Sequence, residues 1–187
     1  INGKRYNRSA LVNVYTGADT ALSFGSQGAD IGNIPAIAIK NLQVLRDGAT
    51  AQYGADALAG VLNYQIRDDE GIDLQGVYGK TYEGDGTSKI IAGNAGLKIG
   101  DSGFINVSAE WFEQGQTSRG ATRASAISLA TTNPGVASSI PNFSRGLPAQ
   151  IWGTSPSDGY KLFLNASFDV GSGSQIYVTG NLSHSET

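Results

Sequence analysis

The sequence predicts a mainly β protein, and three observations carry that prediction. Apolar and polar residues alternate in five separate segments from residue 72 onward, which is the pattern of strands with one apolar face. Helical periodicity is nearly absent over the same region. Glycine supplies 26 of the 187 residues, more than an ordinary globular domain carries, and the short links between segments are rich in it.

The five expected strands cover residues 72–82, 90–99, 104–112, 160–170 and 175–183. In the fourth of them, Leu162 and Leu164 lie on an apolar face, whereas Asn165 and Ser167 lie on the opposite face. A soluble sandwich would turn the apolar faces inward, and a membrane barrel would turn them outward. The alternation alone therefore leaves both architectures open.

The connections favour the barrel. Tight turns at residues 100–103 and 171–174 alternate with longer links at residues 83–88 and 115–159. Outer-membrane barrels have this asymmetry, with short periplasmic turns on one rim and longer external loops on the other. We therefore expect antiparallel barrel strands whose polar faces line a water-accessible lumen. The long segment 115–159 lacks clear periodicity and is expected to be an external loop.

Residues 1–68 differ from the rest of the chain, because they mix short apolar runs with turn clusters. We expect a strand at residues 42–46, a turn or a single helical turn at 48–53 and a second strand at 60–66. The N-terminal region is thus predicted to be a small, mixed α/β segment.

This region resembles the C-terminal half of the plug domain of TonB-dependent outer-membrane receptors. The matching motifs are Ile34-Pro35, Val44-Leu45-Arg46, Tyr53-Gly54 and Gly60-Val61-Leu62-Asn63. One departure is Arg46-Asp47-Gly48, where many members of the family have Arg-Gly-Pro. The resemblance implies that residues 1–68 are the C-terminal part of a plug. It also implies that residues 69–187 are the first five or so strands of a plugged barrel, so that the chain is an internal fragment.

The function that the resemblance implies is active uptake of a scarce ligand across the outer membrane of a Gram-negative bacterium. The ligand would be siderophore-bound iron, cobalamin or an oligosaccharide, and the partners would be the TonB energy-coupling complex and outer-membrane lipid. A soluble or surface-anchored β-rich binding or adhesion module is the alternative, and a passive barrel channel is a third possibility.

The resemblance also implies site residues. Arg46 is expected to meet barrel carboxylates, and Gly54 and Gly60 are expected to allow tight turns or close approach of the plug to the wall. Ligand contacts should come from the plug loop and the external loops. The residue types there that bind anionic or aromatic ligands are Tyr6, Arg8, Tyr15, Arg119, Arg123 and Trp152.

Other classes of function find no support in the sequence. There is no cysteine, and the single histidine, His184, has no second histidine to form a metal site. No catalytic constellation is present, so we expect neither an enzyme nor a cofactor. The net charge of −3 lacks the positive excess that is typical of proteins that bind nucleic acid. No apolar run approaches the roughly 20 residues of a membrane helix.

Overall fold

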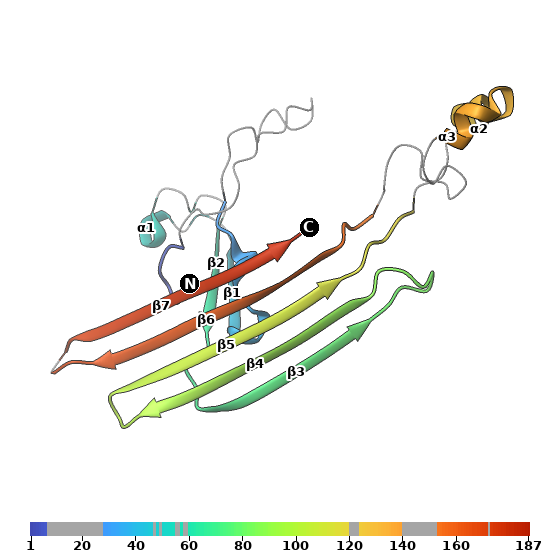
Figure 1. Ribbon diagram of the computed structural model, residues 1–187. Helices are drawn as coiled ribbons and strands as arrows, with labels where there is room; N and C mark the ends of the chain where they lie inside the picture. Colours follow the sequence, from blue (N-terminus) through green and yellow to red (C-terminus); the bar gives the residue numbers. More distant parts are fainter. Residues whose placement is uncertain are drawn as a thin grey trace. The chain divides into compact units, whose positions relative to one another are not determined.

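The structure is a computed structural model that describes residues 1–6, 28–46, 48, 50–54, 57, 60–119, 124–139, 153–171 and 173–187. Strands dominate it and form two antiparallel sheets, one of two strands and one of five (Figure 1). The expected mainly β class is therefore confirmed. None of the helices in these ranges is long and apolar enough to cross a membrane.

The larger sheet is a meander whose spatial order is the order of the chain. Figure 1 shows its strands side by side, and each lies where the alternating pattern predicts a strand. Within the described ranges, the edge strands β3 and β7 each pair with a single neighbour. The strands are β3 (Gly71–Gly79), β4 (Ser88–Ile99), β5 (Gly103–Gln114), β6 (Ser157–Asp169) and β7 (Gln175–Glu186).

The smaller sheet pairs β1 (Ile39–Arg46) with β2 (Gly60–Ile66). Arg46 lies opposite Gly60 in this antiparallel ladder. A single helical turn, α1 (Thr50–Tyr53), lies between the two strands in the chain, and two 3-10 turns, η2 (Ile31–Asn33) and η3 (Ala36–Ala38), precede β1. The strand expected at residues 60–66 is confirmed, and β1 begins three residues earlier than expected.

The long segment 115–159 is more structured than its composition indicates. It contains α2 (Ala124–Thr132) and α3 (Pro134–Ser139), and β6 already begins at Ser157. Both helices are short, and α2 is rich in alanine, the best helix former. A helix is recognised in a sequence by apolar residues that recur on one face. These two helices lack such a face, so the sequence pattern did not predict them.

Packing divides the chain into two compact units, which are described separately. The first contains residues 1–76, 91–111 and 160–184, and the second contains residues 77–90, 112–159 and 185–187. A small apolar core in the first unit joins the N-terminal region to the sheet. Its buried members are Ile34, Ala38, Ile66 and Phe163.

The three central strands of the large sheet, β4 to β6, bury polar side chains on one face, whereas many large apolar side chains of the sheet are exposed. In the first unit, Asn165 is 1% exposed, whereas Leu97 is 68% exposed. Other buried polar residues are Asn94, Asn106, Ser108, Glu110 and Ser167, and other exposed apolar residues are Ile72, Leu74, Ile91, Val107, Ile176 and Leu182. The expectation that Asn165 faces open water is wrong, because the N-terminal region covers that position.

Candidate functional site

The chain's first six residues lie along strand β2 and carry a cluster of charged and aromatic side chains. The Asn2 amide donates to the carbonyl oxygen of Tyr64 at 2.9 Å, and the Asn2 side-chain oxygen accepts from the amide of Ile66 at 2.8 Å. The Gly3 amide donates to the side-chain oxygen of Asn63 at 2.9 Å. These bonds fix the backbone that presents Lys4, Arg5 and Tyr6.

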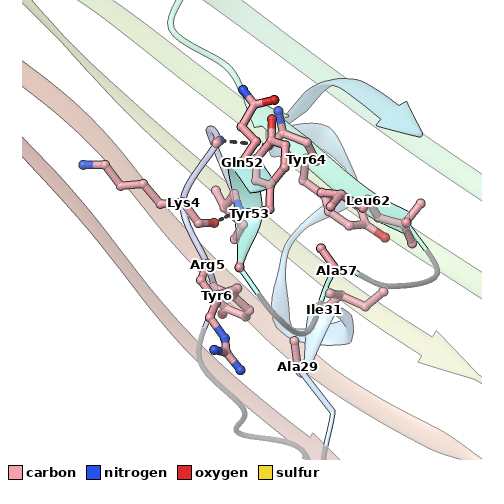
Figure 2. Close-up of a pocket in the computed structure, with 16 residues that line it drawn as sticks. Lys4, Arg5, Tyr6, Ala29, Ile31, Gln52, Tyr53, Ala57, Leu62 and Tyr64 are labelled. Atoms are coloured by element: carbon pink, nitrogen blue, oxygen red, sulfur yellow. Dashed lines mark hydrogen bonds between the residues drawn. The ribbon is translucent and has the colours of Figure 1, made fainter. Parts of the chain in front are cut away.

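A cavity of about 470 Å³ opens beside this segment. Figure 2 shows Arg5 and Tyr6 along the N-terminal segment, with Tyr53 and Tyr64 nearby. The cavity is also lined by the aliphatic side chains of Ile31, Ala57 and Leu62. The cavity is thus apolar in part, with a few polar groups, which is the usual character of a small-molecule site.

A second cavity, of about 260 Å³, shares Ile1, Lys4, Arg5 and Tyr6 with the first. Its other wall is formed by strands β6 and β7. The Lys4 ammonium lies over the Tyr177 ring, 4.5 Å from the ring centre, and the side-chain amide of Asn2 donates to the Tyr177 hydroxyl. The aromatic ring therefore holds the Lys4 cation at this wall.

The charged side chains among the described residues that line both cavities are cationic. Among the described residues that line them, Lys4 and Arg5 carry positive charge, and none is Asp or Glu. Burial and the nearby Asp30 carboxylate raise the pKa of Tyr6. Its hydroxyl is therefore neutral at physiological pH and can donate a hydrogen bond.

A chain of neutral polar side chains runs across the covered face of the sheet. Asn106 accepts from Asn94 at 3.1 Å, and Ser108 donates to Asn94 at 2.8 Å. The Asn106 amide also donates to the carbonyl oxygen of Asp69 at 3.0 Å, in the linker that follows β2. In the same way, Asn165 donates to the carbonyl oxygen of Arg67 at 2.8 Å. Side chains of the sheet thus satisfy backbone carbonyls of the N-terminal region, as buried carbonyls require.

The same face carries one buried carboxylate among the described residues, Glu110. One of its oxygens accepts from the Ala36 amide at 3.0 Å, and the other accepts from the Lys161 ammonium at 2.7 Å. The carboxylate side chain is 6% exposed. It therefore joins strand β5, strand β6 and the 3-10 turn η3 at one point.

The expected plug–wall residues lie around the β1–β2 hairpin. Arg46 and Gly60 line a cavity of about 280 Å³, and the described residues offer Arg46 no carboxylate at ion-pair distance. Gly60 has φ +136°, and its close neighbour is the backbone of Leu45. Gly54 has φ +91° and lines the larger cavity.

Two of the six expected ligand residues, Tyr6 and Arg119, lie within the described residues. Tyr6 lines both cavities. Arg119 holds Asp85 through two side-chain hydrogen bonds of 2.6 and 2.9 Å. The hydrogen bonds from Arg119 are the largest cause, and the hydrogen bond from Thr81 is the second, of an Asp85 pKa well below its usual range. The remaining four candidates, Arg8, Tyr15, Arg123 and Trp152, lie outside the described residues.

Sequence reasoning missed Lys4, Arg5, Tyr64 and Tyr177, which form the cavity walls. It also missed Glu110, although the alternation of β5 placed this residue correctly on the polar face. Its partners lie 51 and 74 residues away in the chain. The one sign of this role in the sequence is that Glu110 is the only charged residue on the polar face of β5.

Within the described ranges, no group of three or more His, Asp or Glu side chains could hold a metal ion. Comparison of the chain with protein-family models, with curated proteins and with solved structures found no match.

Proposed function

We propose that this chain is part of a TonB-dependent transporter in the outer membrane of a Gram-negative bacterium. In this proposal the N-terminal region is the C-terminal part of the plug, and strands β3 to β7 belong to the barrel wall. The observation that carries the proposal is the inverted sheet, whose central strands bury polar side chains and which exposes large apolar ones. Water-soluble domains favour the opposite arrangement.

The exposure of large apolar side chains on one face of the sheet supports a lipid environment. Ile72, Leu74, Ile91, Leu97 and Leu182 are each more than half exposed. Soluble monomers rarely expose contiguous apolar patches beyond a few hundred Å². Lipid would cover this face without a protein partner, and strands of 9 to 13 residues are long enough to cross the hydrocarbon layer when tilted.

The covered polar face supports the assignment of a plug. Glu110, Asn106 and Asn165 each bond to backbone groups between residues 36 and 69. A barrel wall that encloses a plug would need such contacts on its lumen face. Closing the barrel takes at least about eight strands, so the proposal includes strands beyond the five of this chain.

The proposed activity is uptake of siderophore-bound iron, cobalamin or an oligosaccharide, with energy from the TonB complex of the inner membrane. The amphipathic cavity beside Arg5, Tyr6 and Tyr64 supports a ligand that combines apolar or ring surface with polar groups. The cationic lining makes an anionic chelate the first ligand to test.

Two adjacent residues of β7 provide the decisive test. Leu182 lies on the exposed apolar face, and Asn181 lines the second cavity. This chain has no cysteine, so Leu182→Cys and Asn181→Cys can each carry a single spin label in bilayers, once any cysteine elsewhere in the full-length protein has been replaced. We expect lipid-soluble oxygen to relax the label at 182 and a water-soluble nickel chelate to fail there. Shielding of position 182 from both reagents would mean that protein covers this face, as in the alternative β-rich binding module.

Energy coupling separates the transporter from a passive channel. Cells that express the full-length protein should accumulate a ferric chelate, cobalamin or an oligosaccharide, and an uncoupler should abolish accumulation while surface binding persists. Accumulation that continues unchanged with the uncoupler would support passive permeation and contradict active transport.

A further inference from the structure

The buried Glu110 carboxylate makes two contacts that connect strand β5 to other elements. Its oxygens bond to the Ala36 amide at 3.0 Å and to the Lys161 ammonium at 2.7 Å. The Lys161 and Glu110 side chains are 20% and 6% exposed. In the part of the chain that the structure describes, this is the most buried ion pair.

The Ala36 amide needs an acceptor from elsewhere in the fold. Ala36 is the first residue of η3, so its N–H has no partner within the turn. The preceding residue is Pro35, whose side chain cannot cap the turn. Glu110 supplies the missing acceptor from strand β5, and a carboxylate makes a hydrogen bond roughly twice as strong as a neutral group does.

A buried ion pair is a poor source of stability, because desolvation of two charges offsets their attraction. It does specify position, because Glu110 has a partner for each oxygen only when η3 sits against β5 and β6. Asn106 and Asn165 contact the N-terminal region through neutral amides, and Asp73 of the edge strand β3 pairs with Arg67 through a half-exposed carboxylate. Glu110 is the buried carboxylate among these contacts.

We propose that Glu110 is a positioning residue that latches the η3 turn to the sheet, and that Lys161 balances its charge in the closed position. When the turn moves away, water can rehydrate both charged groups, so the contact is reversible. The further step, that the latch opens during transport, rests on the proposed function. The prediction that the latch holds the turn in place is independent of the proposed function.

The test measures access to residue 37, which is 8% exposed within the turn. Ile37→Cys introduces a thiol into a chain that has none. With any cysteine elsewhere in the full-length protein replaced, its labelling rate with a water-soluble maleimide reports opening. We expect Glu110→Gln to raise that rate about tenfold or more. Glu113→Gln is the matched control, because Glu113 pairs with Lys89 on the neighbouring strand in an exposed ion pair, and it should change the rate less than twofold.

A second variant keeps the ion pair and removes only the donor. Proline is tolerated at the first position of a helical turn, and the extended Pro35 backbone at ψ 132° suits a following proline. Ala36→Pro should therefore fold and raise labelling as Glu110→Gln does. Labelling at the Glu113→Gln rate in either folded variant would overturn the latch.

A conductance measurement separates the latch from the proposed function. If the N-terminal region plugs a barrel, Glu110→Gln should raise KCl conductance through planar bilayers that contain the full-length protein, and Glu113→Gln should not. Faster labelling with unchanged conductance would support the latch and contradict its role in a plugged barrel. Unchanged labelling would contradict the latch whatever the conductance.

Discussion

Gly60 approaches the carbonyl oxygen of Leu45 so closely that a Cβ atom at residue 60 would overlap that oxygen. Its backbone also has φ +136°, a conformation that side chains disfavour. The hairpin of β1 and β2 can therefore close at Arg46 only with glycine in the opposite strand. The close approach is to the partner strand, within the N-terminal region itself.

Substitution of Gly60 by alanine should destabilise this hairpin by more than about 1 kcal/mol, because strain and overlap act together. Gly54→Ala is the control, since Gly54 has φ +91° with open space around its Cβ position. Chemical unfolding of the full-length protein, followed through a probe in residues 39–66, would compare them. Equal losses for the two variants would show that the contact with Leu45 adds nothing to backbone strain.

The linker after β2 passes over Gly96 of strand β4. A Cβ atom there would overlap the Asp69 carbonyl oxygen and would lie 2.8 Å from the side-chain oxygen of Asn106. We expect Gly96→Ala to destabilise the protein by about 1–3 kcal/mol through overpacking and to break the bond from Asn106 to Asp69. Gly76→Ala has open space and should be much milder. Thermal unfolding in detergent would measure both, and equal midpoints would contradict the close approach.

A charge on the apolar face should impair membrane insertion if the proposed function is right. Leu182→Arg places a cation near the middle of β7 and should cost roughly 2–4 kcal/mol of folding free energy in a bilayer. Asn181→Arg, one residue away and beside a cavity, should cost little. Folding into vesicles of defined thickness, titrated with urea, gives both values. Equal tolerance of the two substitutions would place residue 182 outside the hydrocarbon layer.

The Asp85–Arg119 pair predicts a defined acid sensitivity in the second unit. Because folding lowers the Asp85 pKa below 3.8, the pair contributes stability above that pH. The contribution declines as the pH falls below 3.8 towards the lowered value. Carboxyl NMR titration should therefore show Asp85 still ionised at pH 3.8.

Arg119→Gln removes the largest cause of that shift and provides the control. The Asp85 titration should then move up towards 3.8, even though the Thr81 hydrogen bond remains. An unchanged midpoint in this variant would mean that Arg119 does not hold the carboxylate. Salt should weaken the wild-type pair as well, because both side chains are partly exposed.

The sequence by itself determined the strands and their two faces. The alternation of Leu162 with Phe163, and of Leu182 with Asn181, depends only on neighbouring residues and on the two-residue repeat of a strand. The helical turn at Thr50–Tyr53 followed from local turn signals in the same way. The helices α2 and α3 were missed because they are short and have no apolar face to mark them.

Only the tertiary structure decided which face is covered and which charged residues meet. Asn165 was correctly assigned to the polar face, yet its burial depends on a linker 98 residues earlier in the chain. The pairing of Arg119 with Asp85, 34 residues away, was likewise not predictable from the sequence. Glu110 gained its role from Ala36 and Lys161, which reach it from two other elements. The local sequence pattern determines which face of a strand a side chain lies on. Its contacts depend on packing between segments that are distant in the chain, and the local pattern holds no information on that packing.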